Sequence, residues 1–221
     1  MKKLKIPSNL TRLAYNSIKE YILDGRLDES SRLTEEFLST QLGISKSPIR
    51  EALNRLEAEG LLHIEPRKGA YLRRLAAEDV SDLYDLREAL ETCVVRTAKL
   101  TPELFTGLRQ SLQGQRAFLK ANDRANYIAE DVHFHSELAR ATGNTQLCAI
   151  LESIQNQIWL ARRNTYDLSS QTAPDDHEAI VKALEAGDCR RAESAMRDHI
   201  RNVSRRLLVF QESRVPEERV G

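Results

Sequence analysis

Four residues in the second half of the chain have types and spacings that suit metal binding. Asp131 and His135, in the segment EDVHFHSEL, are four positions apart, so on a helix their side chains lie about 40° apart on one face. His177 lies at the start of HEAIVKAL and His199 lies in AMRDHI, so two further imidazoles can approach from neighbouring helices. One carboxylate and three imidazoles suit a divalent transition metal such as Zn, Ni or Mn, with one or two coordination positions left open.

The alternative for each of these histidines is an ordinary packed or surface side chain. His133 points away from the group, because it is two positions from His135 on the same expected helix. A metal with an open position can also activate water, so a metal-dependent hydrolase is one interpretation. No spare Glu or His has a spacing that would supply the general base. The lack of a general base favours two other interpretations. In one the metal helps the bundle to bind a ligand, and in the other the metal is purely structural and the bundle forms a dimer.

Arg87 provides a cation in the same part of the chain. Its helical phase matches that of the apolar residues around it, so its guanidinium is expected in the interior, where it needs an anionic partner. That partner is either an internal acid, Glu91 or Asp131, or the carboxylate of a small-molecule effector. Arg162 and Arg163 are further candidates for an effector site, but their place at a helix end favours the surface.

Six helices are predicted to position these residues. They follow a short polar segment at 73–80 and cover 82–100, a helix that starts at Thr101 and Pro102, 123–141, 145–163, 176–186 and 189–211. In the first of them the residues expected to face inward are Leu83, Leu86, Leu90 and Val94. Because no segment has convincing strand alternation, residues 78–212 are predicted to form an all-α antiparallel helical bundle.

A different pattern lies between residues 42 and 61, LGISKSPIREALNRLEAEGL. Its Gly and Ser residues predict a sharp turn, and Pro48 is tolerated in the first turn of the helix that follows. The buried stripe of this helix is expected to comprise Ile49, Ala52, Leu53 and Leu56. Lys46 and Arg50 then lie one turn apart on the exposed side, where Arg50 can form a fork with guanine and Lys46 offers a point charge.

The neighbouring segments complete a winged helix-turn-helix over residues 1–74. Helical spacing covers 11–23, and Thr34 caps a short second helix with Glu35 and Glu36 in its first turn. The segment LLHIEPRKGAYL predicts two short strands, 61–64 and 70–72, joined by a basic turn. A plain helical hairpin with two solvated cations is the alternative. The predicted fold class is therefore mainly α, with the winged domain followed by the bundle.

Composition and charge are consistent with two modules. A chain with 41% hydrophobic and 30% charged residues is not disordered, and it lacks an apolar run long enough for a membrane helix. The protein is therefore expected in the cytoplasm, without a membrane partner. Of the 33 Lys and Arg and the 33 Asp and Glu, residues 1–74 contain 14 and 10, which leaves 19 and 23. This uneven distribution fits a first module that faces phosphate.

The text TEEFLSTQLGISKSPIREALNRLEAEGLL, with the wing PRKGAYL, closely resembles the GntR family of bacterial transcription regulators. The resemblance implies a homodimer that reads two half-sites of a double-stranded operator. It also implies DNA contacts from Ser45, Lys46, Ser47, Arg50, Arg67, Lys68 and Gly69. Many members of the family carry Arg where this chain has Lys46 and Glu36. The first difference keeps a cation, and the second removes one.

A second resemblance covers residues 78–210. The motifs D-x-x-F-H, GN and H-E-A-I, with a final His 22 residues later, are similar to the FCD effector domain found with GntR readers. In that family the matching residues bind a metal, which implies this role for Asp131, His135, His177 and His199. FCD domains often bind small organic acids, which implies effector binding by Arg87. Together the resemblances imply a transcription regulator, expected to be a repressor that its effector releases from DNA.

Overall fold

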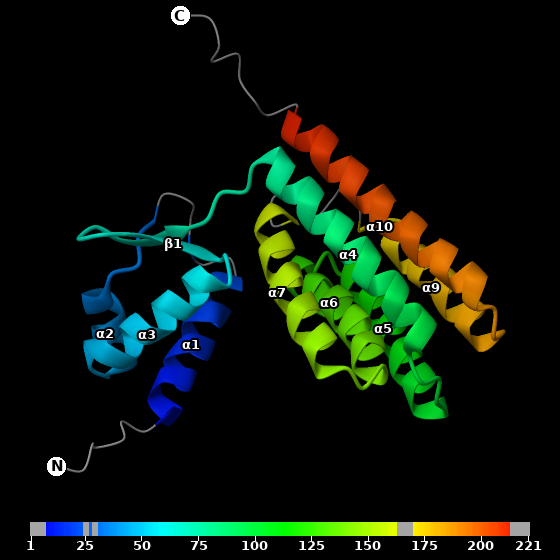
Figure 1. The fold of residues 1–221 in the computed structure, drawn as a ribbon, viewed down its shortest axis with the longest axis horizontal. Coiled ribbons are helices and arrows are strands. Elements are labelled where there is room, and N and C mark those ends of the chain that lie inside the picture. Colours follow the sequence, from blue (N-terminus) through cyan, green and yellow to red (C-terminus); the bar gives the residue numbers. More distant parts are fainter. Residues whose placement is uncertain (1–7, 24–26, 28–30, 163–169, 213–221) are drawn as a thin grey trace, which may run out of the picture. The chain divides into compact units, whose positions relative to one another are not determined.

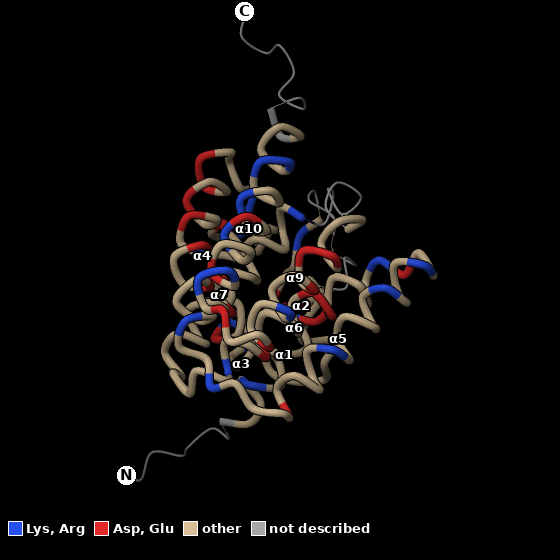
Figure 2. Tube along the Cα trace, turned by 90° about the vertical axis from the view of Figure 1, so that its right-hand side faces the viewer, with Lys and Arg blue, Asp and Glu red and all other residues tan. Residues whose placement is uncertain are grey.

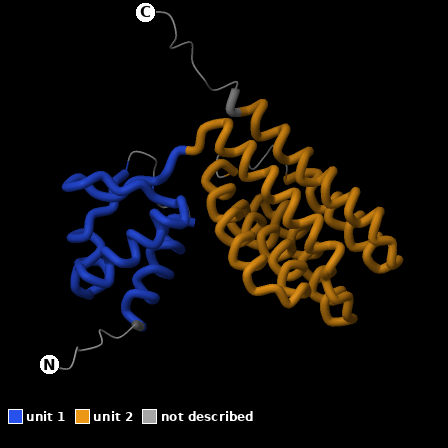
Figure 3. The backbone as a smooth tube through the Cα atoms, viewed as in Figure 1, with its two compact units in different colours: residues 1–74 blue, residues 75–221 orange. Residues whose placement is uncertain are grey.

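The computed structural model describes residues 8–23, 27, 31–162 and 170–212 of the chain. The chain divides into two compact units, residues 1–74 and residues 75–221 (Figure 3). Helices dominate both units, and the first also contains a two-stranded antiparallel sheet (Figure 1). The predicted fold class, a winged helix-turn-helix followed by a helical bundle, is confirmed.

The described residues of the first unit form three helices and a hairpin. Its elements are α1 (Ser8–Leu23), α2 (Glu35–Leu42), α3 (Lys46–Ala58), β1 (Leu62–Glu65) and β2 (Gly69–Leu72). Helix α3 packs against α1, α2 and β1, and β1 pairs with β2 so that His63 lies opposite Tyr71. The predicted strand ends lie within one residue of the observed ends.

Local capping explains the tight turn between α2 and α3. Thr34 caps α2 by accepting a hydrogen bond from the backbone N–H of Phe37 at 3.1 Å, as the sequence predicted. Gly43 ends α2 in the left-handed conformation with φ 65°, which a glycine adopts without steric cost. The Ser39 hydroxyl then donates to the carbonyl of Ile44 at 2.6 Å. The predicted buried stripe of α3 is also confirmed, comprising Ile49, Ala52, Leu53 and Leu56.

The second unit is a helical bundle. Its described helices are α4 (Ala77–Thr97), α5 (Pro102–Lys120), α6 (Arg124–Ala141), α7 (Thr145–Arg162), α9 (Ala173–Glu185) and α10 (Cys189–Glu212). Helix α4 packs against α6, α7 and α10, and α5 packs against α6 and α9. Each of these six helices contributes to one apolar core. Within the described ranges, no helix has the length and apolar character needed to cross a membrane.

The buried face of α4 differs from the prediction at one position. Leu83 and Val94 are buried as expected, but Leu86 is 54% exposed and the prediction for it is wrong. Leu86 lies on the edge of the apolar stripe, and the bundle instead covers the opposite edge, which carries Tyr84 and Arg87. Helix α4 therefore presents charged and polar groups to the interior as well as apolar ones.

Complementary charges connect α4 and α10, which lie side by side. Figure 2 shows acidic positions along α4 and basic positions along α10. Glu88 on α4 accepts hydrogen bonds from Arg201 at 2.7 and 2.8 Å and lies 3.5 Å from Arg197. These exposed pairs help to fix the register of the two helices but contribute little stability.

Candidate functional site

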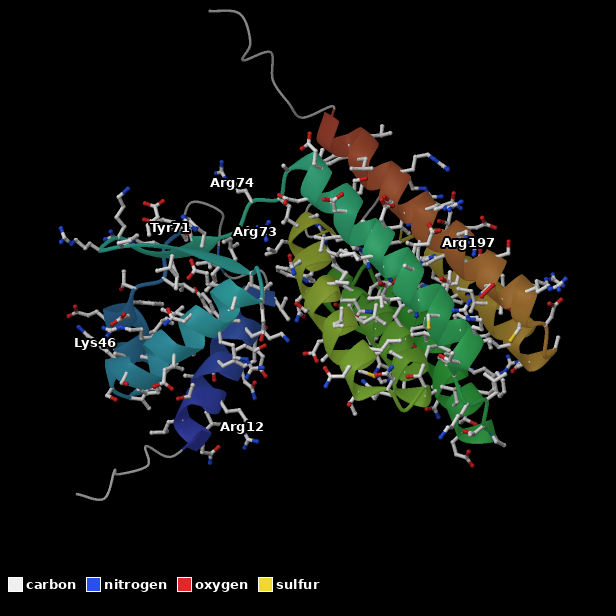
Figure 4. The ribbon with its side chains drawn as sticks, in the orientation of Figure 1. Arg12, Lys46, Tyr71, Arg73, Arg74 and Arg197 are labelled. Atoms are coloured by element: carbon white, nitrogen blue, oxygen red, sulfur yellow. The ribbon has the colours of Figure 1, made fainter. Side chains whose placement is uncertain are left out.

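The amino end of α3 presents small and basic side chains to solvent. Ser45 is its N-cap residue, and Ser45, Lys46, Ser47 and Arg50 are all exposed, while the opposite side of the helix is buried. Lys46 projects from the start of this helix (Figure 4). Small exposed residues allow close approach of the helix end to a base edge or a phosphate.

Two cations of α3, Lys46 and Arg50, are paired with acids of α2. Arg50 donates from Nε to Glu35 Oε1 at 2.7 Å and from Nη2 to Glu35 Oε2 at 2.8 Å. Lys46 Nζ lies 3.5 Å from Glu36 Oε2. The sequence pattern placed both glutamates in the first turn of this helix but did not predict these pairs. The sequence did contain an indication of these ion pairs, because Glu35 and Glu36 lie in the first turn of α2, the helix that packs against α3.

The turn between β1 and β2 carries the basic residues of the wing. Arg67 and Lys68 are exposed, and Lys68 Nζ lies 2.7 Å from Glu65 Oε2. Gly69 has φ 130°, and a Cβ at this position would lie 2.8 Å from the carbonyl oxygen of Leu33. Gly69 is therefore required for the close approach of the wing to the chain before α2.

A groove of about 400 Å³ separates α3 from the wing. Its lining includes Glu35, Arg50, Asn54, Arg67, Lys68 and Gly69. Residues from α3 and from the wing therefore face a common space. The arrangement suits a double-stranded nucleic acid, because the wing and α3 can contact one duplex together.

Three histidines meet in the interior of the second unit. His135 on α6, His177 on α9 and His199 on α10 are buried, and one ring nitrogen of each lies within 4.8 Å of the others. The Nε2 atoms of His177 and His199 are 3.2 Å apart. Asp131 is also buried, and its Oδ1 lies 3.9 Å from His177 Nε2. His133 is exposed, as the spacing predicted.

The outer nitrogen of each imidazole is held by an acceptor. His135 Nδ1 contacts Glu91 Oε2, His177 Nδ1 lies 2.8 Å from Gln115 Oε1, and His199 Nδ1 lies 3.3 Å from Asp176 Oδ2. The three acceptors are a carboxylate, an amide oxygen and a second carboxylate, which accept hydrogen bonds and donate none. Each Nδ1 therefore carries the proton, and each Nε2 presents a lone pair to the centre.

This donor set fits a metal ion. Among the described residues, His135 Nε2 and Asp131 Oδ1 have no hydrogen-bond partner although both are buried. Buried polar atoms without partners are rare in folded proteins and indicate a missing ligand, ion or water. Three imidazole nitrogens and one carboxylate oxygen are ligands that divalent transition metals accept.

The electrostatics keep these groups in the protonation states that ligands need. Burial, with His199 and His135 nearby, holds the pKa of His177 well below its ordinary value, and burial also lowers the pKa of His199. Burial favours a raised pKa for Asp131, but Arg162 and His177 beside it hold that pKa well below its ordinary value. His177 and His199 are therefore neutral and Asp131 is ionised at neutral pH.

Two buried arginines occupy the space beside the histidines. Arg87 Nε donates to Glu91 Oε1 at 2.6 Å, which is the internal salt bridge left open by the sequence. Glu91 is buried, which favours a raised pKa, but His135 and Arg87 lower its pKa to about 2. Arg162 donates from Nη1 to Asp131 Oδ2 at 2.5 Å and is 6% exposed, so its expected surface position is wrong.

Arg162 is buried because α7 extends to Arg162 and ends over the acid of α6. Arg163 lies outside the described residues. A small cavity lies between Arg87, Asp131 and Arg162, with Gln155 and Trp159 in its lining. Its volume of about 10 Å³ is space for roughly one water.

Gln115 and Asp176 are residues of this candidate site that the sequence analysis did not identify. Gln115 is fully buried on α5, and nothing in its local sequence distinguishes it from a surface glutamine. Asp176 directly precedes His177 in the sequence, which was a usable signal. Both act by orienting a histidine instead of facing the centre themselves.

Comparisons with family models agree with this architecture. The model for "Bacterial regulatory proteins, gntR family" matches residues 10–79, and the model for the FCD domain matches residues 82–202. The two matches correspond to the unit that contains the wing and to the unit that contains the histidines.

Curated relatives span most of this chain. It is 30% identical to the "Probable D-xylose utilization operon transcriptional repressor" of Paenarthrobacter nicotinovorans, over 81% of this chain and 80% of that protein. It is 28% identical to the gluconate operon transcriptional repressor of Bacillus licheniformis, over 76% and 72%. The solved structure of E. coli McbR/YncC has the same fold, with a TM-score of 0.82 at 21% identity, covering 92% of this chain and 98% of that one.

Proposed function

The chain belongs to the gntR family of bacterial regulatory proteins, with an FCD domain in its second unit, and we propose that it represses transcription until a small organic acid binds beside a metal in that domain. It is a DNA-binding transcription regulator and not an enzyme. A metal-dependent hydrolase is thereby set aside. DNA binding is assigned to residues 1–74 and sensing to residues 78–212.

In the proposal, α3 enters the major groove of a double-stranded operator. Ser45, Lys46, Ser47 and Arg50 contact bases and phosphates from this helix, and Arg67, Lys68 and Gly69 do so from the wing. Two observations support the assignment: all of these residues except Gly69 are exposed, and Arg50, Arg67, Lys68 and Gly69 line one groove. A homodimer places two such surfaces on the two halves of a near-palindromic site.

A divalent metal, Zn, Ni or Mn, is assigned to Asp131, His135, His177 and His199. The observation that carries this assignment is the convergence of one ring nitrogen from each of three buried histidines, each of which has an acceptor at its Nδ1. When bound, the metal supplies a Lewis acid that can accept a carboxylate oxygen from an effector. The surrounding residues hold the imidazoles in place and exclude water.

The effector is proposed to be a small organic acid that interacts with Arg87 or Arg162. Both guanidiniums are now paired with internal carboxylates, so an incoming carboxylate has to replace Glu91 or Asp131 as a partner. The cavity of about 10 Å³ is too small for such a molecule, so its binding has to open the bundle near α7. This opening provides the change that the DNA-binding units can respond to.

The small cavity also supports a second candidate. In this second candidate function, the metal is purely structural and the bundle serves only to form the dimer. The two candidates differ in their response to organic acids, because a ligand that binds the native state raises its melting temperature.

The test is thermal unfolding of the purified protein, whose metal content has been determined by elemental analysis, in the presence of a panel of small mono-, di- and tricarboxylates. Sensing predicts that chelation lowers the melting temperature and that at least one acid raises it only in the metal-loaded protein. A chelator effect without any acid effect would instead establish the structural metal.

A further inference from the structure

Glu35 and Arg50 form the best-oriented ion pair on the proposed DNA-binding surface. The carboxylate of Glu35 accepts from Arg50 Nε and Nη2, at 2.7 and 2.8 Å, so it occupies one edge of the guanidinium. Three of the five N–H donors of Arg50 remain, two on Nη1 and one on Nη2. One from each nitrogen forms the end-on fork that matches O6 and N7 of guanine.

Stability does not account for this pair. The side chain of Arg50 is 63% exposed, and pairs at such positions contribute little to folding. The carboxylate also repels phosphates at a surface that faces DNA. The pair therefore weakens the attraction to DNA and adds little to folding stability. Its remaining effect is on orientation, because a two-point contact fixes the plane of the Arg50 guanidinium.

The backbone that carries Glu35 is itself anchored to the wing. Leu33 exchanges two backbone hydrogen bonds with Ala70 of β2, each 2.8 Å long. The Thr34 side chain then caps α2 immediately before Glu35. Glu35 therefore starts from a fixed point between the recognition helix and the wing, and its side chain is 31% exposed.

The neighbouring pair lacks these features. Lys46 meets Glu36 through one contact of 3.5 Å, and the Glu36 side chain is 83% exposed. A single long contact between exposed side chains fixes neither group. Glu36 therefore supplies a matched control, since it carries the same charge one position along the same helical turn.

From this geometry we propose that Glu35 is a positioning residue for sequence recognition, which holds Arg50 so that its free edge meets a guanine in each operator half-site. The inference rests on the proposed base contact of Arg50. Glu35 is ionised for this role, because its hydrogen bond with Arg50 lowers its pKa. Glu35 touches no base, so it lowers nonspecific affinity while it raises discrimination.

The experiment selects duplexes from a randomised double-stranded DNA library with the full chain at one fixed salt concentration, and sequences the bound fraction. Wild type is compared with Arg50→Ala, Glu35→Gln, Glu35→Asp and Glu36→Gln, and binding to an unselected duplex is measured in parallel. Glu35→Asp retains the charge but shortens the reach. It also preserves an acid in the first turn of α2 if the Gln variant folds poorly.

Wild type is expected to show a guanine preference of roughly 5- to 150-fold at one position of each half-site. Arg50→Ala should abolish this preference, and both Glu35 variants should reduce it by about fivefold or more. Glu36→Gln should retain it, although both Gln variants should bind the unselected duplex more tightly. An unchanged preference in both Glu35 variants, with a lost preference in Arg50→Ala, would overturn the role of Glu35 alone. A preference that survives Arg50→Ala would overturn the base contact on which it rests.

Discussion

The imidazole rings of His177 and His199 face each other inside the second unit, with their Nε2 atoms 3.2 Å apart. Both rings donate their Nδ1 protons outward, to Gln115 and Asp176. Two lone pairs at this distance repel each other unless a cation lies between or beside them. The hydrogen bonds to the outer nitrogens thus favour a filled metal site.

Removing one histidine should empty the proposed site. His177→Ala is expected to lower the metal content of the purified protein and to leave nonspecific DNA binding nearly unchanged, because the metal site lies in the other unit. The measurement is elemental analysis after dialysis. His133→Ala is the matched control, since His133 is exposed on the helix that carries His135. Full metal occupancy in His177→Ala would show that the ligand assignment is wrong.

The residues that orient the histidines should affect metal affinity without binding metal. Gln115→Ala and Asp176→Ala are each expected to weaken metal binding by about 10- to 100-fold, since such partners fix the tautomer and the ring orientation. The affinity is measured by competition with a chromogenic chelator. Asp175→Ala provides the control, because Asp175 is exposed and pairs with Arg116 at the surface. Equal affinities in all three variants would contradict the proposed orientation.

Arg162 should be important for stability in the metal-free protein. Arg162→Ala removes the partner of the buried Asp131 carboxylate and is expected to lower the free energy of unfolding by about 3 to 5 kcal/mol. Denaturant unfolding measures this loss. The double variant Arg162→Met with Asp131→Asn should recover most of it, because no uncompensated charge remains. A loss below about 1 kcal/mol for Arg162→Ala would show that the pair is unimportant.

The wing should depend on a glycine at one position. Gly69→Ala is expected to destabilise the first unit by about 1 to 3 kcal/mol, because it forces a Cβ into φ 130° and to within 2.8 Å of the Leu33 carbonyl. Thermal unfolding measures this effect. Lys68→Ala serves as the comparison, since it should leave stability intact and reduce the salt dependence of DNA binding by about one unit of slope. Wild-type stability in Gly69→Ala would contradict the packing role.

Much of the fold could be predicted because local signals and apolar periodicity agree. Thr34, Gly43 and Thr101 are caps that their sequence context identifies, and the structure has all three. The predicted burial of Leu86 was wrong, because periodicity locates an apolar stripe but does not show which edge of that stripe the neighbouring helices cover. That choice depends on packing partners distant in the sequence.

The candidate metal site could be predicted in part for the same reason. His177 and His199 were located from residue type and from the family resemblance, and they lie together with His135. Gln115 and Arg162 could not be placed, because their roles depend on contacts across 62 and 31 residues of chain. A long-range contact of a polar residue leaves no periodic signal in a single sequence.

The proposed sensing function requires that effector binding in the second unit changes the affinity of the first unit for DNA, which a titration measures. A duplex recovered from the library selection is titrated with metal-loaded protein at fixed salt, with and without an acid that raises its melting temperature. The acid is predicted to weaken binding by about 5- to 150-fold in wild type and to have no effect in His177→Ala. Operator affinity that is the same with and without every such acid would contradict the proposed sensing function.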